Sequence, residues 1–526
     1  MIPTRLGLLL ASFSLLLPAA ARSQEPLHTR IDALVAAKSA GHPIAPPADD
    51  ASFVRRVYLD FAGRIPSTSE VRAFLADATP DKRTRLIDQL LAAPEYSQRM
   101  TELFHVILME RRGDHEEWQK FLRASFAANK PWDQMVREIL KPNPDDETTR
   151  GAAFFYTKRL ENYGQNAIDF PGLTRDVGRL FLGKDLQCAQ CHDHLFIDDY
   201  KQVDFQGLFT IYQDTLIRTD VAFPAVSEKP KPQKLEFVSV FDPTKNAVGP
   251  RIPDGKEFDI PQPVPEAGGY SPLTWLSMEL PNPNNKLFSQ NIANRLWFIM
   301  LGRGLVHPLD LYHSQNPPSH PELLDLLAQE FVAHGYDIKW MLRELALSQT
   351  YQRASAAPEG QAVPPPESYA IANQRRLSAE QLLRSVLQAT GELDRAIKES
   401  ATPDVATGPS LKELQERFIA AFANPAREPE DEFNASVKAA LFLLNDDKML
   451  QLLQPRPGNL MERLGATASP EQAAEELFLS ILSRQPTDEE RTDVVQYLAT
   501  MPDRRPIALS HLAWSMLSSL EFYVNH

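Results

Sequence analysis

The two cysteines of this chain, Cys188 and Cys191, lie three positions apart, and His192 follows the second one directly. A C-x-x-C-H sequence is the pattern at which haem is covalently attached. The spacing suits that chemistry because each thiol can add to one vinyl group of the porphyrin. The adjacent imidazole can then bind the iron, for which it is an ordinary axial ligand. The motif therefore predicts haem c held by Cys188, Cys191 and His192.

The same stretch is also compatible with a different metal. Cys188, Cys191, His192 and His194 carry thiolate and imidazole groups, which zinc or another divalent metal accepts as ligands. Adjacent Cys191 and His192 are awkward partners on one small ion, which favours haem. A redox-active dithiol is a third alternative, but its usual βαβ setting is not evident in the flanking sequence. A Cys/His metal site stays the main alternative to haem.

Acidic residues crowd the loop after the motif. With His194 they could form a carboxylate–histidine site for a divalent ion, or they could orient His192 through hydrogen bonds. A solvated loop with an aspartate capping a helix near Asp199 explains them equally well. The residues concerned are Asp193, Asp198, Asp199 and Asp204.

His320 is the candidate for the distal side of the haem or for a neighbouring polar site. It stands in NPPSHPELL, directly before a proline that suits the first turn of a helix. The alternative is that this segment only sets a rigid helix entry. Methionine is another common axial ligand, but the first methionine after the motif is Met278, far along the chain.

Amphipathic helices must position these residues. Apolar side chains recur at helical spacing in many segments, and Ser67 to Glu70 resembles a capping box. The helix before the motif is predicted to end at Gly183, a normal residue at a helix C-terminus. Predicted helices are 51–61, one from Ser67, one from Pro80, 118–129, 132–140, 174–182, 287–301, 321–334, 339–349 and several within 378–522.

Residues 217–270 have a different pattern from the rest of the chain. KLEFVSVFDP and EFDIPQPV contain β-forming residues among many prolines, which predicts strands in a connector. We therefore expect a mainly α, multi-domain helical protein with a small β-containing connector in the middle.

Composition disfavours one class of function, and the N-terminal residues indicate a location. The formal net charge is −14, which disfavours nucleic-acid binding through phosphate contacts. Residues 1–23 have a basic start, an apolar run and small residues for cleavage, which is typical of a signal peptide. We predict an extracytoplasmic protein, periplasmic or secreted, with no membrane span after signal removal.

Several long motifs extend this pattern over most of the chain. They are RRVYLDFAGRIPSTSEVRAFL at 55–75, the stretch 182–209 around the motif, NIANRLWFIMLGRGLVHPLDLYHSQNPPSHPELLDLLAQEF at 291–331 and LFLSILSRQPTDEER at 477–491. The chain resembles secreted planctomycete-type proteins that pair a cytochrome-like domain of unknown function with a second secreted domain of unknown function. One residue departs from the family pattern: Leu195 follows CHDH, at a position where these proteins usually have proline.

The sequence patterns and the resemblance together predict the following division of the chain. A signal peptide at 1–23 precedes a cytochrome-like domain at 26–216 and the strand-containing connector at 217–270. The second secreted domain begins at 271–353, continues after a proline-rich linker at 354–368, and ends with a helical part at 369–526.

Three classes of function remain open from the sequence. The first is a haem-bearing redox protein that exchanges electrons with a partner protein. The second is a metal-binding extracellular enzyme that acts on polysaccharide or another extracellular substrate, although no catalytic carboxylate pair can be chosen. The third is a structural or interaction protein in which the motif holds a metal.

Overall fold

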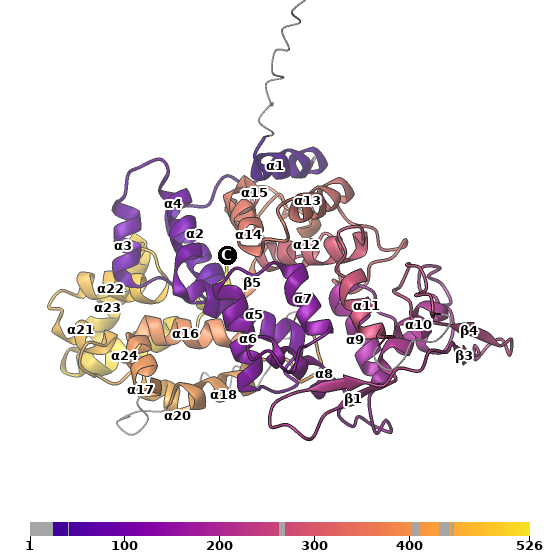
Figure 1. Cartoon of the computed structure of the whole chain (residues 1–526). Coiled ribbons are helices and arrows are strands. Elements are labelled where there is room, and N and C mark those ends of the chain that lie inside the picture. The colour runs from indigo at the N-terminus through magenta and orange to yellow at the C-terminus, as the bar shows by residue number, and fades with distance from the viewer. Residues whose placement is uncertain (1–24, 40, 262–268, 402–409, 431–441, 443–445) are drawn as a thin grey trace, which may run out of the picture.

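The structure is a computed structural model, and it describes residues 25–39, 41–261, 269–401, 410–430, 442 and 446–526. The predicted signal peptide lies outside these residues. Within them the chain is mainly α-helical, as predicted, and its strands form only two-stranded sheets (Figure 1).

The helices of the first part of the chain are α1 (Leu27–Lys38), α2 (Asp50–Phe61), α3 (Thr68–Ala76), α4 (Lys82–Ala92), α5 (Pro94–Met109), α6 (Glu116–Ala127), α7 (Trp132–Leu140), α8 (Phe154–Arg159), α9 (Phe170–Leu182) and α10 (Gln202–Tyr212). The middle part contains α11 (Pro272–Glu279), α12 (Lys286–Leu301), α13 (Pro321–Ala333), α14 (Ile338–Leu347) and α15 (Gln349–Gln352). The last part contains α16 (Ala379–Thr390), α17 (Leu393–Ala401), α18 (Leu411–Phe422), α20 (Asp447–Gln451), α21 (Leu460–Ala466), α22 (Pro470–Ile481), α23 (Asp488–Thr500), α24 (Arg505–Leu517) and α25 (Leu520–Tyr523).

Short 3-10 turns and strands complete the described chain. The turns are η1 (Arg150–Ala153), η2 (Cys188–Gln190), η3 (Pro366–Ser368) and η5 (Pro502–Arg504). The antiparallel strand pairs are β1 (Thr215–Ile217) with β2 (Val226–Glu228), β3 (Leu235–Phe237) with β4 (Asn246–Val248), and β5 (Arg375–Arg376) with β6 (Val524–Asn525).

Local sequence signals set several helix ends. Ser67 and Glu70 form the predicted capping box at the start of α3. Gly183 ends α9 with a φ of 68°, a conformation that glycine adopts without strain. The third predicted helix begins at Lys82 and not at Pro80, because residues 77–81 form a turn in which Thr79 donates to the Asp77 carboxylate. The sequence therefore located this helix but not its start.

The first hydrophobic core takes side chains from Leu27 through Tyr369, on both sides of the connector. Helix α12 lies within it and packs against α9, α13 and α14. Trp118, from α6, and Trp297, from α12, are both fully buried in this core. Segments that are far apart in the sequence thus share one apolar interior, while the domain boundaries inferred from the sequence stay a prediction.

The second hydrophobic core lies in the C-terminal part of the chain and runs from Leu377 to Phe522. In Figure 1 its helices, coloured orange to yellow, gather at one end of the molecule. Leu59 and Ile65, from α2 and the turn after it, also belong to this core. The N-terminal part of the chain therefore contributes directly to the interior of the C-terminal part.

Helix α2 connects the two cores through two consecutive buried arginines. Arg55 donates to the carbonyl oxygens of Ile481 at 3.3 Å and Phe522 at 2.8 Å. Arg56 binds a different segment of the chain, since it donates to the carbonyl oxygens of Arg353 at 2.9 Å and of Tyr351. Because both guanidinium groups are buried, these carbonyls are their required hydrogen-bond partners.

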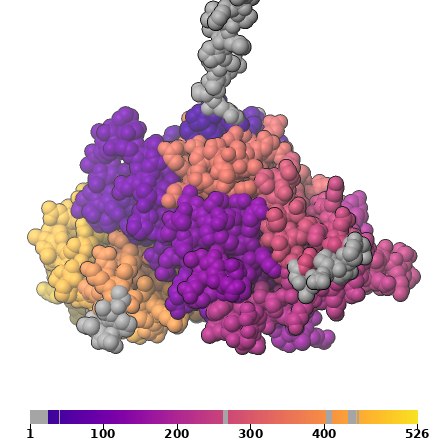
Figure 2. All heavy atoms as spheres, viewed as in Figure 1, coloured from indigo at the N-terminus to yellow at the C-terminus, as the bar shows by residue number. Residues whose placement is uncertain are grey.

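The predicted β-containing connector is present, and it begins at the end of α10 (Gln202–Tyr212). β3 lies within KLEFVSVFDP, as predicted, whereas EFDIPQPV forms no strand over residues 257–261 and its remainder lies outside the described residues. Figures 1 and 2 show the β3–β4 hairpin projecting from the end of the molecule opposite the second core. Its loop segment passes beside the C-x-x-C-H motif, as shown below.

No helix in the described part of the chain combines the length and the apolar composition that a membrane crossing requires.

Candidate functional site

Helix α9 delivers the chain to the C-x-x-C-H motif. Asp169 caps its N-terminus by accepting a hydrogen bond from the Gly172 amide at 3.0 Å. At its other end, a β-carbon on Gly183 would lie 3.0 Å from the Asn291 side-chain oxygen. Glycine is therefore required there for its left-handed backbone and for the close approach of α12.

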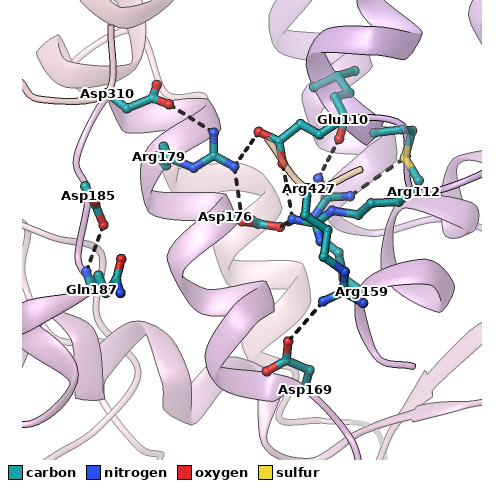
Figure 3. A network of polar contacts seen from close by, with 12 residues as sticks. Glu110, Arg112, Arg159, Asp169, Asp176, Arg179, Asp185, Gln187, Asp310 and Arg427 are labelled. Carbon is teal, nitrogen blue, oxygen red and sulfur yellow. Dashed lines mark hydrogen bonds and ion pairs between the residues drawn. The ribbon is translucent and has the colours of Figure 1, made fainter. Parts of the chain in front are cut away.

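A buried polar network holds α9 in place (Figure 3). The Asp176 carboxylate accepts from Arg112 at 2.7 Å and from Arg159 at 2.8 Å. One turn further, Arg179 pairs with Glu110 at 2.6 Å and with Asp310 at 3.0 Å. The network links α9 to α5, α8 and the loop after α12, so the helix that carries the motif is fixed on several sides.

Both motif thiols face solvent from one tight turn. Cys188 and Cys191 are exposed and are not joined in a disulfide. The Cys191 amide donates to the Cys188 carbonyl at 3.3 Å, and the His192 amide donates to the same oxygen at 3.4 Å. Between the cysteines, Ala189 is fully buried in the first core and anchors the underside of the turn. The two sulfur atoms are thus presented outward from a fixed base.

The His192 ring is oriented by the backbone. Its Nδ1 lies 2.6 Å from the Asp193 carbonyl oxygen, an acceptor that requires a proton on Nδ1 in the neutral ring. The unprotonated Nε2 is then available as a ligand atom. An imidazole that donates through one nitrogen to a carbonyl oxygen and binds metal through the other is a common arrangement in metal sites.

Apolar side chains beside the motif are unusually exposed. Val240 donates its amide to the Cys191 carbonyl at 3.1 Å, and the Phe241 ring lies 4.8 Å from the His192 ring. Phe241 is 67% exposed, although it is large and apolar. We define an apolar rim around the motif as Leu195, Phe196, Val238, Val240 and Phe241, all of them exposed. Apolar surface of this kind commonly marks a place that another group covers.

His194 has a structural role that involves one of its nitrogens. Its Nδ1 accepts from the amides of Phe196 at 3.2 Å and Ile197 at 3.0 Å, which closes the loop after the motif. The ring packs edge-on against Tyr200, with centroids 6.0 Å apart. Its Nε2 is then the protonated nitrogen, so metal binding by His194 would require that proton to leave.

Three of the four predicted aspartates have protein partners, and the fourth, Asp198, is exposed. Asp193 accepts from the Gln202 amide at 2.8 Å, at the start of α10. Asp199 accepts from the Ser314 amide at 2.5 Å, and Asp204 pairs with Arg251 at 2.8 Å. Across the described ranges, no three His, Cys, Asp or Glu side chains come together as ligands for one ion.

His320 lies in the first core, at the start of α13. It is 4% exposed, its Nδ1 is 3.1 Å from the Ser319 hydroxyl, and its ring is 5.5 Å from the Tyr369 ring. Burial, with a smaller effect from Lys38, lowers the pKa of His320 to about 4. None of these contacts reaches the motif, and a role as distal ligand stays a prediction.

The loop after α12 contacts the motif region through a different histidine. The His313 ring lies 5.4 Å from the Tyr200 ring, and Gln315 donates to the Phe196 carbonyl oxygen. The sequence pattern indicated His320 and not His313. It also missed Val240 and Phe241, whose contact with the motif depends on a turn some fifty residues later that no local pattern indicates.

The fold and the site define a mainly helical protein with a C-x-x-C-H surface turn, and comparison with protein families specifies its class. Residues 30–216 match PSCyt2, described as a protein of unknown function (DUF1549), and residues 274–498 match PSD1, described as a protein of unknown function (DUF1553). The chain belongs to the planctomycete-type family in which this cytochrome-like domain precedes this secreted domain. No curated protein and no solved structure matches it.

Proposed function

We propose that this chain is an extracytoplasmic electron-transfer protein with a covalently bound haem c. Cys188 and Cys191 would form the two thioether bonds, and His192 would bind the iron through Nε2. The observation that carries the proposal is the 2.6 Å contact between His192 Nδ1 and the Asp193 carbonyl, which leaves the opposite nitrogen free to coordinate. When bound, the haem would supply one-electron redox chemistry at its iron.

The donor set and its surroundings fit this group better than a compact metal site. Both thiols are accessible and free, as thioether formation requires. The apolar rim offers side chains that would pack against a porphyrin and limit its contact with water. His194 already uses Nδ1 to close the loop, which argues against its joining the two thiols on one small ion.

The chain's own residues would divide the work as follows. The cysteines hold the cofactor, the Asp193 carbonyl fixes the tautomer of His192, and the rim residues shield one edge. A redox partner would then dock near the exposed motif, where electrons can pass without substrate chemistry. The leader at 1–23 would place the protein outside the cytoplasm, where the enzymes that attach haem c act on exported chains.

The test is expression in a host with haem c maturation machinery, followed by a pyridine haemochrome spectrum and a haem stain on a denaturing gel. The wild-type chain should retain one haem after denaturation. The double variant Cys188→Ala/Cys191→Ala should lose it, whereas His334→Ala, at an exposed histidine elsewhere, should keep it.

His192→Ala should alter the Soret spectrum because it removes the proximal ligand. Wild-type protein that contains no covalent haem and instead carries stoichiometric zinc, lost in the double cysteine variant, would refute the haem proposal and establish the metal site.

A further inference from the structure

A cavity of about 280 Å³ lies between the two hydrophobic cores. One side is formed by α5, α9 and α12, which belong to the first core. The other side is formed by residues 374–381, at β5 and the start of α16, and by Phe422 of α18. The cavity is separate from the motif turn, since neither motif cysteine nor His192 lines it.

Acidic side chains in the cavity wall are already neutralised by arginines. They line the space, yet each has a cationic partner within ion-pair distance. The pairs are Glu102 with Arg384 at 2.7 Å, Glu430 with Arg111 at 2.8 Å, Glu380 with Arg111, and Glu110 with Arg179 at 2.6 Å. These carboxylates therefore leave little uncompensated negative charge in the cavity.

Two further arginines in the wall have carboxylate partners of their own. Arg375 pairs with Asp60 at 2.8 Å, and Arg295 pairs with Asp310. The charge of each is therefore paired within the protein, although the buried Nε of Arg295 has no acceptor. They contribute structure to the wall and do not require a ligand.

Arg99 differs from the other arginines of the wall. It is 7% exposed and lines the cavity, yet it makes no hydrogen bond or ion pair with any residue that the structure describes. Its buried Nε has no acceptor, and burial lowers the pKa of its guanidinium. The nearby carboxylates of Glu102, Asp60 and Glu380 favour its charged form without a hydrogen bond or ion pair to it, so an anion in the cavity would supply the partner that the buried cation lacks.

The backbone makes room for Arg99. Gly63, in a left-handed conformation with a φ of 68°, faces the arginine stem, and a β-carbon there would lie 3.0 Å from Arg99 Cδ. The stem therefore runs along a surface that only glycine leaves open. This close approach directs the guanidinium group towards the cavity.

The remainder of the wall combines uncharged polar side chains, among them Gln374, Asn424 and Asn525, with an apolar part. Leu103, Ile107, Phe298, Ile299 and Phe422 belong to this apolar part. A ligand that satisfies both parts needs an anionic head for Arg99 and an apolar body for these side chains. The cavity has room for one aromatic ring, because an apolar cavity of about 150 Å³ already binds benzene.

We propose that this cavity binds a small organic anion, with a carboxylate, sulfate ester or phosphate ester placed on Arg99 and an apolar ring or chain against α5, α12 and α18. The planar guanidinium group pairs with all three kinds of head group through parallel hydrogen bonds. Binding would bridge the two cores, because both supply parts of the wall.

Titration calorimetry on the full chain tests this with benzoate, phenyl sulfate and phenyl phosphate as probes. At least one probe should bind with a Kd below about 1 mM. Inorganic phosphate lacks the apolar ring and benzyl alcohol lacks the anionic head, so each should bind at least about tenfold more weakly. Arg99→Gln should weaken the anion by about 10- to 100-fold, the loss expected for one charge-assisted contact. Arg72→Gln, at an exposed arginine outside the cavity, is the matched control.

Two further variants separate binding from folding. Arg99→Met removes an unpaired buried charge, so the ligand-free variant should unfold at the same urea concentration as the wild type or at a higher one. Ile299→Trp fills the cavity and should abolish binding while Arg99 remains. The proposal is overturned if no probe binds the wild type at about 10 mM, or if Arg99→Gln and Ile299→Trp both fold and bind as the wild type does.

Discussion

The substitution Asp176→Asn tests whether the network beside α9 is held by charge. Asp176 is 7% exposed, and its carboxylate is the one anion paired with Arg159 among the described residues. Burial alone would raise the pKa of the Asp176 carboxyl, but the three surrounding guanidinium groups hold it below its ordinary value of 3.8. The carboxylate is therefore the stable form at neutral pH, and the amide removes that charge with little change of shape.

The expected effect follows from the charges of the network. Four arginines meet three carboxylates, so one positive charge is in excess, and the amide raises this excess to two. Removing one partner of a buried ion pair costs about 3–5 kcal/mol. An unfolding entropy near 2.1 cal/mol/K per residue, taken over the whole chain, converts this to a fall in Tm of roughly 4 °C.

Urea unfolding followed by tryptophan fluorescence, with calorimetry for Tm, measures the effect. Glu116→Gln, at a side chain that is 79% exposed, is the matched control and should change the unfolding free energy by less than about 0.5 kcal/mol. Because the pKa of Asp176 is lowered by folding, its contribution is present above the unfolded pKa and is lost as the pH falls below it. The variant should therefore lose less stability than the wild type on acidification.

A second substitution identifies the cause of the loss. Adding Arg159→Met to Asp176→Asn removes the buried cation that the first change leaves unpaired, so part of the stability should return. A loss below about 1 kcal/mol for Asp176→Asn, compared with the 3–5 kcal/mol expected for a buried pair, would refute the argument that charge holds α9 in place.

Three further predictions address the site and its supports. Gly183→Ala should destabilise the protein by about 1–2 kcal/mol. The loss should exceed that of Gly335→Ala, because Gly335 has a similar left-handed φ but no atom within 4 Å of an added β-carbon. Equal losses would show that the close approach of Asn291 to Gly183 is unimportant. Burial lowers the pKa of His320 from 6.5 to about 4, so the unfolded chain binds a proton at a higher pH than the folded chain does, and the free energy of unfolding should fall as the pH drops below 6.5. In urea titrations at several pH values, His320→Asn should flatten this dependence on pH. An unchanged dependence would contradict the prediction. Phe241→Ser should leave covalent haem content unchanged but shift the reduction potential measured by redox titration, since a polar group would replace an apolar one beside the His192 ring; an unchanged potential would exclude rim contact with the cofactor.

Local signals in the sequence predicted many of the helices, although not α1, α5, α8 or α11. The apolar pattern at 132–140 matches α7 at both ends, and Gly183 ends α9 as its position indicated. These features depend on residues within a few positions of one another, so they can be recognised without knowledge of the fold.

Contacts between distant segments could not be predicted in the same way. Phe241 reaches His192 from the connector, and the partners of Asp176 come from α8 and from the turn after α5. Arg99 belongs to an ordinary amphipathic pattern, and only the packing of the two cores shows that it lacks a partner. Such properties depend on tertiary packing, where the identity of a neighbour is set by the whole fold.

Helix α2 has a consequence for how the protein can be divided. A fragment that ends before residue 374 would leave the Arg55 guanidinium without the carbonyls of Ile481 and Phe522, and the remaining fragment would expose the apolar surface that Leu59 covers. Neither piece would then be a self-sufficient unit, whichever family boundary guides the cut. The two pieces should instead behave as complementary fragments that fold upon each other, so that a nick between them leaves a single associated particle.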